Sequence, residues 1–402
     1  MKKKFAAMLM AAAMVFTMAA CGQKADTPDT PDNSGDPDEQ SGAKAQTFVL
    51  GSCGPLTGGY AIYGQAVVNG AELAVEEINA SDSTVKFTFL KQDDEGDGEK
   101  AINAYNDMMD NGMQVLVGPT TTGASIAVAA VTYDDRTFML TPSASSPDVT
   151  HGNDVNYDNV FQVCFTDPNQ GTGAADYIAE NMAGAKVAVI YRNDDAYSQG
   201  IRDTFVKEAE AKGAFEIVSE TTFTLATATD FSVQLTAAKN AGADVVFLPI
   251  YYEPASVILS QAKAMSYAPT FFGVDGMDGI LTMKNFDTSL AEGVMLLTPF
   301  SANSEDEATK SFVKTYTEKF GVEPNQFAAD AYDAVYIVKA ALEKAGCTGD
   351  MTAPEICDAL VGVMTSLSVD GLTGKAMTWN AEGEVSKAPL AAVIENGEYV
   401  MK

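Results

Sequence analysis

The feature that most constrains the fold of this chain is a repeated alternation of short β-rich runs with helical segments, which begins at residue 46. Runs rich in Val, Leu and Phe are typical of strands, and apolar residues three or four positions apart indicate helices. Strands that alternate with helices predict an α/β fold, in which helices cover both faces of a parallel sheet. The predicted strands lie at 48–51, 85–90, 115–117 and 137–141, and the predicted helices at 64–80, 100–111 and 123–133.

The same alternation restarts near residue 170. Because one hydrophobic core usually stops growing at about 250–300 residues, a chain of 402 residues is expected to form two lobes, each a doubly wound parallel sheet. Ligands of such open sheets bind beyond the carboxyl ends of the strands, so two facing lobes would share one cleft. The second set comprises strands at 186–191, 216–220, 244–250, 271–273 and 293–297 and helices at 171–182, 198–212, 231–241 and 254–266, followed by helices at 305–320, 327–345 and 354–364 and a β-rich tail from 371.

The N-terminus has the pattern of an export signal. Three lysines at positions 2–4 precede the uncharged apolar run 5–20, which is shorter than the roughly 20 residues that span a membrane. Residues 1–20 are therefore predicted to be a signal peptide. The sequence Ala19-Ala20-Cys21 resembles the bacterial lipobox, in which the cysteine is lipidated; an ordinary secretory signal with an incidental cysteine is the alternative. Residues 21–45 lack large apolar side chains and are predicted to be a disordered acidic linker.

Composition argues against several classes of function. The chain carries 25 basic and 55 acidic residues and a formal net charge of −30, which would repel the phosphate backbone of a nucleic acid. Its single histidine is His151, it has no C-x-x-C pair, and the glycines of its first strand–helix loop do not follow the G-x-G-x-x-G spacing. Metal, thiol-redox and dinucleotide sites therefore lack their usual residues. The acidic run 93–97 lacks the rest of a calcium-binding loop and is interpreted as solvated. We expect no cofactor, no metal and no catalysis.

Four cysteines besides Cys21 are present, an even number that suits an oxidising compartment. We favour a pair between Cys347 and Cys357, which would close a short loop between two helices, with Cys53 and Cys164 as the other candidate pair. The alternative, to which we give equal weight, is that all four are small buried hydrophobes.

Several short motifs occur in a fixed order along the chain. The first is Pro55–Gly58 in the loop before the first helix, and the helix itself continues as GAELAVEEIN over residues 70–79. Further motifs lie at 118–123, 141–147, 167–171, 195–200, 230–232 and 331–334. Together they are similar to the corresponding segments of the leucine/isoleucine/valine-binding proteins, the amino-acid receptors of ABC importers. The resemblance extends over residues 46–402.

This resemblance implies a type I periplasmic binding protein whose lobes are joined by three hinge crossings, near residues 165, 299 and 370. Lobe 1 would comprise 46–165 and 300–370, and lobe 2 would comprise 166–299 and 371–402. The resemblance also implies a monomeric receptor, lipid-anchored to the outer face of the bacterial cytoplasmic membrane, that delivers an amino acid to an ABC permease and its ATPases. Closure of the lobes would hold the ligand without making or breaking a bond.

Two loops of lobe 1 carry the residues that the resemblance places at the ligand carboxylate. Thr122 precedes a predicted helix, whose free N–H groups and positive dipole end attract an anion, and Ser145 adds a second hydroxyl. Helix capping and turn formation are the alternative roles for such residues. The predicted ligand residues on these loops are Thr121, Thr122, Ser143, Ala144 and Ser145.

The resemblance implies that Asp275 holds the ligand ammonium, with the backbone carbonyl of Ser143 as a second acceptor. A carboxylate forms strong charge-assisted hydrogen bonds, but the shorter Asp stands here where the family has Glu, and a solvated turn aspartate is the alternative. Aromatic rings are implied to surround the ligand. Because side chains alternate along a strand, only one of Tyr251 and Tyr252 can face the cleft easily, and the resemblance favours Tyr251. The predicted aromatic residues are Tyr63, Tyr197, Tyr251 and Phe327.

Of the three arginines in the chain, only Arg192 follows the carboxyl end of a predicted strand. It either reaches the rim of the cleft or forms a salt bridge with Asp194 or Asp195. Without a cation for a second carboxylate, the expected ligand is an α-amino acid with an uncharged, branched aliphatic side chain. The alternative is a receptor of the same fold for a short amide, an aromatic acid or a peptide-like compound, used for uptake or sensing.

We expect the substitution Cys21→Ala to release the protein from the membrane fraction, because it removes the predicted attachment point of the lipid. Membrane and soluble fractions of cells that express each form would be compared by immunoblotting. Retention of the variant in the membrane fraction would contradict lipidation at Cys21.

Overall fold

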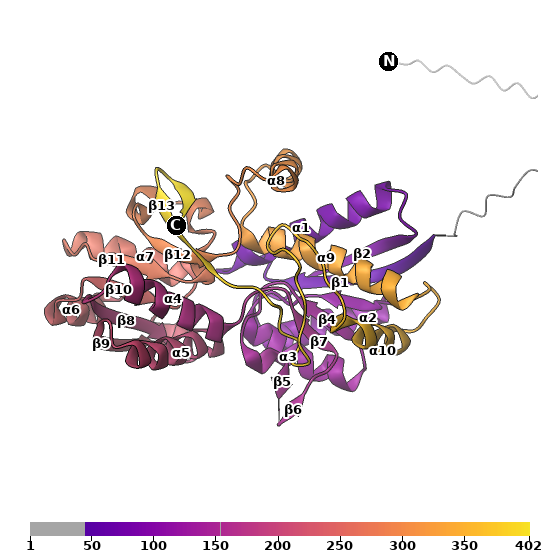
Figure 1. The fold of residues 1–402 in the computed structure, drawn as a ribbon, viewed down its shortest axis with the longest axis horizontal. Helices are drawn as coiled ribbons and strands as arrows, with labels where there is room; N and C mark the ends of the chain where they lie inside the picture. Colours follow the sequence, from indigo (N-terminus) through magenta and orange to yellow (C-terminus); the bar gives the residue numbers. More distant parts are fainter. Residues whose placement is uncertain (1–44, 153) are drawn as a thin grey trace, which may run out of the picture. The chain divides into compact units, whose positions relative to one another are not determined.

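Two sheets with helices on both faces form the two lobes, which confirms the predicted α/β class (Figure 1). The computed structural model describes residues 45–152 and 154–402. The predicted signal peptide, Cys21 and nearly all of the predicted linker lie outside the described residues. Within the described part of the chain, no helix is long and apolar enough to cross a membrane.

The first sheet has the strand order β2-β1-β3-β4-β7, and all its strands are parallel. On β3, Val117 packs in the apolar cluster that contains the first and ninth helices, whereas the adjacent Leu116 packs with the second and third. This burial of both faces explains why β3 and β4 are continuous apolar runs. The lobe contains β1 (Gln46–Gly54), α1 (Ala61–Ala80), β2 (Val85–Asp93), α2 (Gly98–Asp110), β3 (Val115–Val117), α3 (Thr122–Asp134), β4 (Phe138–Thr141), β7 (Val160–Gln162), α8 (Glu307–Phe320), α9 (Gln326–Ala345) and α10 (Ala353–Met364).

The second sheet has the order β14-β13-β12-β11-β10-β8-β9. The strands from β8 to β12 are parallel, and the C-terminal hairpin of β13 and β14 adds an antiparallel edge. On β10, Phe247 packs with α4 and α5, whereas Val246 packs with the cluster that contains α6 and α7. The lobe contains α4 (Asp167–Asn181), β8 (Lys186–Arg192), α5 (Ala196–Lys212), β9 (Glu216–Phe223), α6 (Ser232–Ala241), β10 (Val245–Leu248), α7 (Tyr252–Ala264), β11 (Thr270–Gly273), β12 (Met295–Thr298), β13 (Leu390–Glu395) and β14 (Glu398–Met401).

Short elements that the sequence pattern did not predict lie mainly in the loops. They include a small hairpin and five 3₁₀ helices, which have too few residues to show a periodicity. Strand β7 was also not predicted. The short elements are η1 (Pro147–Val149), β5 (His151–Gly152), β6 (Val155–Asn156), η2 (Leu225–Thr227), η3 (Asp275–Met277), η4 (Ile280–Thr282) and η5 (Thr288–Ala291).

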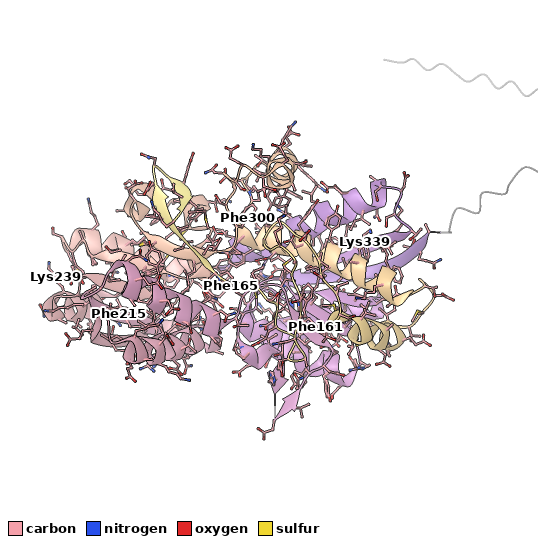
Figure 2. All side chains as sticks on the ribbon, in the orientation of Figure 1. Phe161, Phe165, Phe215, Lys239, Phe300 and Lys339 are labelled. Carbon is pink, nitrogen blue, oxygen red and sulfur yellow. The ribbon has the colours of Figure 1, made fainter. Side chains whose placement is uncertain are left out.

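The chain passes between the lobes at three places. The first crossing lies between β7 and α4, and the second lies between β12 and α8. Phe165 and Phe300, in these two crossings, are buried, and Figure 2 shows both in the middle of the described structure, whereas the exposed Lys239 lies on the outer side of the second lobe.

The third crossing follows a segment that hydrogen-bonds to the first lobe. The backbone N–H groups of Leu372 and Thr373 donate to the Asp333 carboxylate on α9 at 2.8 and 2.9 Å. The Trp379 indole donates to the carbonyl of Gln162 at 2.8 Å. The chain reaches the second sheet only at β13, so the region predicted as a β-rich tail is largely irregular up to residue 389. From these contacts we propose that the third crossing lies after Lys387, rather than near residue 370.

The favoured disulfides are absent from the described structure, and this prediction was wrong. Cys53, Cys164, Cys347 and Cys357 are free thiols, and all are buried. Cys347 and Cys357 pack among apolar side chains, as does Cys53 in a separate cluster. The alternative interpretation, small buried hydrophobes, describes them correctly.

A buried ion pair joins the segment before the third crossing to α9. The Lys387 ammonium lies 2.5 Å from the Asp330 carboxylate and 2.7 Å from the Thr373 hydroxyl. The side chains of Lys387 and Asp330 are only 3% and 2% exposed. Removal of one partner therefore leaves a buried charge without compensation.

We expect Lys387→Met to lower the free energy of unfolding by about 3–5 kcal/mol, because it leaves the Asp330 carboxylate unpaired in the interior. Urea denaturation followed by circular dichroism would measure the change. The double substitution Lys387→Met with Asp330→Leu should recover much of the loss, and Lys207→Met, at an exposed position, should change the stability by less than about 0.5 kcal/mol. Equal stability of wild type and Lys387→Met would contradict this role.

Candidate ligand-binding site

The candidate site is a cavity at the carboxyl ends of the parallel strands, where open α/β sheets bind ligands. Loops after β1, β3 and β4 of the first lobe meet loops after β8, β10 and β11 of the second. The cavity has an empty volume of about 270 Å³. Its lining residues are Tyr63, Thr120, Thr121, Thr122, Ser143, Tyr197, Tyr251, Asp275, Gly276 and Phe327.

The first lobe presents hydroxyl and backbone donors at the start of α3. Thr121 is the N-cap residue and Thr122 the first residue of this helix, and no side chain caps its N-terminus. The Thr121 hydroxyl is buried and has no hydrogen-bond partner among the described residues. The Ser143 hydroxyl donates to the Thr120 carbonyl at 2.5 Å, which ties the two loops together. Unpaired donors at a helix N-terminus suit an anionic group.

The second lobe presents the carboxylate of Asp275, which is 3% exposed and begins η3. The Tyr197 hydroxyl donates to this carboxylate at 2.5 Å. Burial raises the pKa of Asp275 to about 7, although hydrogen bonds from Tyr197 and Gln170 oppose the increase and the nearby Asp330 adds to it. A cation bound beside Asp275 would favour its ionised form, since an opposite charge lowers the pKa of a carboxyl group.

Aromatic rings from both lobes wall the cavity. Tyr63 meets Phe327 edge-to-face at 4.8 Å between ring centroids, and Tyr251 stacks on Tyr197 at 4.7 Å. Asn325 caps α9 by accepting a hydrogen bond from the backbone N–H of residue 328, which places Phe327 in the first turn of that helix. Tyr63 also meets Tyr251 edge-to-face at 5.4 Å, so the apolar walls of the cavity contact each other across the two lobes.

Hydrogen bonds also join the lobes around the cavity. The Tyr63 hydroxyl donates to the carbonyl of Gly276 and accepts from the backbone N–H of Tyr252 at 3.1 Å. The Tyr252 hydroxyl donates to the carbonyl of Gly59 at 2.6 Å. Tyr252 therefore points toward the first loop, and Tyr251 is the tyrosine of this pair that lines the cavity.

The structure brings eight of the ten predicted ligand residues around the cavity, and Ala144 and Ser145 are the two that do not line it. Both are fully buried. The Ala144 carbonyl accepts from Gln162 at 2.8 Å, and the Ser145 carbonyl accepts from the backbone N–H of Asp167 at 2.9 Å. The loop turns after Ser143, so these two residues pack toward the first crossing rather than the cavity.

Sequence reasoning missed Thr120 and Gly276 as lining residues. Both adjoin predicted residues, and this adjacency was the available signal. A Cβ atom at Gly276 would lie 2.6 Å from the Tyr197 hydroxyl and 2.9 Å from the Tyr251 ring. Only glycine therefore fits between these two rings without displacing them.

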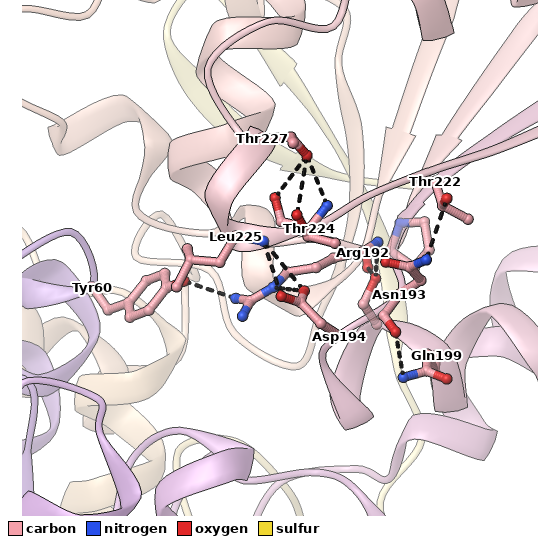
Figure 3. Close-up of polar contacts among 11 residues, drawn as sticks. Tyr60, Arg192, Asn193, Asp194, Gln199, Thr222, Thr224, Leu225 and Thr227 are labelled. Atoms are coloured by element: carbon pink, nitrogen blue, oxygen red, sulfur yellow. Dashed lines mark hydrogen bonds and ion pairs between the residues drawn. The ribbon is translucent and has the colours of Figure 1, made fainter.

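Arg192 lies at the rim and does not line this cavity. Figure 3 shows its guanidinium between Asp194 and Tyr60: Nε lies 2.7 Å from the Asp194 carboxylate, and Nη1 donates to the Tyr60 hydroxyl at 3.0 Å. The predicted alternative of a salt bridge with Asp194 is therefore confirmed, and the same side chain reaches across to the first lobe. Among residues 45–152 and 154–402, no group of three or more His, Cys, Asp and Glu side chains could hold a metal ion.

The chain is similar in sequence and in fold to several known proteins. A family model described as periplasmic binding protein matches residues 47–398. A Leu/Ile/Val-binding protein homolog of Brucella melitensis is 32% identical over 308 residues, which cover 76% of this chain and 81% of that protein. The Leu/Ile/Val-binding protein of Escherichia coli is 25% identical, over 85% of this chain and 89% of that protein. The branched-chain amino acid transporter substrate-binding protein of Streptococcus pneumoniae, solved with isoleucine, superposes with a TM-score of 0.77 at 28% identity, over 89% of this chain and 100% of that chain.

We expect the stability of Asp275→Asn relative to wild type to increase as the pH rises from about 4 to 7. The pKa of Asp275 is raised to about 7 in the folded state, so in this window the folded protein holds a proton that the unfolded chain has lost. Wild-type stability then falls with increasing pH, by up to about 1.4 kcal/mol per pH unit, and the asparagine variant lacks this contribution.

Urea denaturation at pH 5, 6, 7 and 8 would measure the difference between the two proteins. Buried carboxyl groups that do not interact with Asp275 contribute equally to both proteins and cancel, whereas Asp167 and Asp330 are coupled to Asp275. Asp82→Asn, at an exposed position, is the matched control and should show a difference that hardly depends on pH. A pH-independent difference for Asp275→Asn would contradict the raised pKa.

Proposed function

Because the chain belongs to the periplasmic binding protein family, we propose that it is an extracytoplasmic receptor that binds a branched-chain α-amino acid and delivers it to an ABC importer. The observation that carries this proposal is the composition of one cavity. Donors for an anion come from the first lobe, a carboxylate comes from the second, and aromatic rings lie between them. The named relatives, which are Leu/Ile/Val-binding proteins, support the same class of ligand.

In the proposed complex, the ligand carboxylate binds at the N-terminus of α3. The free hydroxyl of Thr121 and the backbone N–H groups of the first turn are the donors, and the positive end of the helix dipole adds to the attraction. The hydroxyl of Thr122 is a further donor. Hydrogen bonds to a charged group contribute about 1.5–3 kcal/mol each, so this end of the site would supply much of the affinity.

The ligand ammonium binds at Asp275 in this proposal. An ammonium beside the buried carboxylate compensates its charge and shifts Asp275 to the ionised form. Tyr197 holds the carboxylate in place through its hydroxyl. The Asp at this position in place of the family's Glu is accommodated by η3, which carries Asp275 directly to the cavity wall.

The proposed ligand side chain is uncharged. None of the ten lining residues is Arg or Lys, so a second carboxylate would be buried without a cation, at a cost of several kcal/mol. The rings of Tyr63 and Phe327 offer apolar contact to an aliphatic side chain. Glutamate and aspartate should therefore be rejected.

We propose that ligand binding stabilises the arrangement in which the two lobes contact each other. The bonds from Tyr63 to Gly276, from Tyr252 to Gly59 and from Arg192 to Tyr60 all join the lobes. A ligand that contacts both lobes adds to these bonds and shifts the equilibrium toward this state. The permease would recognise the closed receptor, and the ligand would leave chemically unchanged.

We propose that the mature protein is a monomer, tethered by a lipid on Cys21 to the outer face of the cytoplasmic membrane. The acidic residues 21–45 would act as a spacer between the membrane and the lobes. The support is the sequence pattern of the N-terminus.

We expect leucine and valine to bind the purified protein, and glutamate, isobutylamine and isovalerate to bind at least about tenfold more weakly, since each of the latter leaves a charge or a polar half-site unpaired. Isothermal titration calorimetry of the five compounds against one protein preparation would measure this. Isobutylamine and isovalerate are matched controls that each retain one half of valine. Tight binding of glutamate without binding of leucine or valine would contradict the proposed ligand class.

A further inference from the structure

A second cavity adjoins the candidate site. Its empty volume is about 690 Å³, compared with about 270 Å³ for the first cavity. Tyr251 lines both, so this ring is the partition between them. The second cavity is formed mainly by the second lobe, where Phe223, Ile250 and Val257 supply apolar walls, and Tyr60 of the first lobe closes one side.

Hydrogen bonds hold the rim of the second cavity in place (Figure 3). The backbone N–H of Leu225 donates to both oxygens of the Asp194 carboxylate, at 3.3 and 3.1 Å. Asp194 accepts from Arg192, and Arg192 in turn donates to the Tyr60 hydroxyl. These bonds connect η2, the end of β8 and the first loop of the other lobe. A cavity with a cross-linked rim is preorganised, which lowers the entropic cost of binding.

Tyr251, which separates the two cavities, differs from the neighbouring tyrosines in the hydrogen bonds of its hydroxyl. The hydroxyls of Tyr63 and Tyr197 each make two hydrogen bonds, and the Tyr60 hydroxyl accepts one from Arg192. The Tyr251 ring packs against Tyr60, Tyr63 and Tyr197, but its hydroxyl makes no hydrogen bond with any described residue. Ring packing alone therefore positions the wall between the cavities.

The charges around the second cavity disfavour an anionic occupant. Arg192 is already paired with Asp194, so it offers little to a further anion. Asp195 and Glu253 also line the cavity, and they would repel a carboxylate. The aromatic rings of Tyr60, Phe223 and Tyr251 are the largest surfaces available, and an aromatic ring that packs against them gains both apolar burial and favourable ring contacts.

We propose that the second cavity is an extension of the ligand site that receives an aromatic side chain, with Tyr251 as the residue that determines access to it. This inference rests on the proposed function, since it assumes an amino acid bound between Asp275 and α3. A small aliphatic side chain stays within the first cavity. A side chain such as that of phenylalanine extends past Tyr251 toward Phe223 and Val257.

Two substitutions that fill the second cavity test this inference: Ala228→Trp from the rim and Val257→Phe from α7. Ala228 and Val257 line the second cavity but not the first. Calorimetric titrations of the full-length protein with phenylalanine, valine and lysine would be compared for each variant. We expect both variants to weaken phenylalanine binding by roughly tenfold or more and to change valine binding less than about twofold. Ala226→Trp, at an exposed position of η2, which ends just before Ala228, is the matched control and should leave both affinities unchanged.

The inference is overturned if wild type binds valine but not phenylalanine, a result that leaves the proposed function intact. It is also overturned if phenylalanine binding is unaffected in both filled variants, or if phenylalanine and valine weaken equally in both while Ala226→Trp is normal. The assignment is also refuted if lysine binds wild type and both filled variants weaken lysine binding by the amount expected for phenylalanine. That result would assign a cationic occupant to the second cavity. Failure of wild type to bind any of the tested amino acids would instead reject the proposed function.

Discussion

The cost of burying carboxyl groups between the lobes governs much of this structure. A buried carboxylate needs compensation from a cation or from several hydrogen bonds, and Asp275 and Asp330 are both buried between the lobes. Asp330 has the Lys387 ammonium as its partner. The partners described for Asp275 are neutral, and burial raises its pKa to about 7. In the proposed complex, the ligand ammonium gives Asp275 the compensation that Lys387 gives Asp330. Ligand binding and the stability of the interlobe region would thus both depend on how the buried Asp275 carboxylate is compensated.

Much of the fold was predictable because strands that are buried on both faces appear in the sequence as continuous apolar runs. β3 was predicted with its observed ends, and α9 and α10 differ from their predicted ranges by one residue. The features that were not predicted depend on contacts between residues far apart in the sequence. In the described part of the chain, no α-helix lies between β4 and β7, so the alternation of strands and helices gave no signal for β7, and its three residues are a strand because they pair with β4. The chain near Thr373 stays with the first lobe because Asp333, forty positions earlier, accepts its hydrogen bonds.

The candidate site was predictable in outline for a similar reason. Loops at the carboxyl ends of parallel strands converge, which agrees with the grouping of Thr121, Tyr197 and Asp275 that the family resemblance implied. Local turns could not be foreseen. Ser143 faces the cavity while Ser145 turns toward the first crossing, and sequence spacing does not distinguish them. The position of Arg192 was also ambiguous, because its pairing depends on the geometry of the loop that carries Asp194.

The C-terminal hairpin of β13 and β14 has a consequence for how the protein matures. In Figure 1 the yellow hairpin lies with the second sheet, although the orange helices that precede it cover the first. The chain emerges from the ribosome with its N-terminus first. β12 can therefore pair with β13 only after α8, α9 and α10, which lie between them in the sequence, have been synthesised. The first sheet likewise cannot be covered on one face until α9 and α10 have been synthesised. The second sheet cannot be completed before β13 and β14 have been synthesised, and such long-range pairing folds slowly. The nascent chain would therefore remain incompletely folded until residues 390–401 are available.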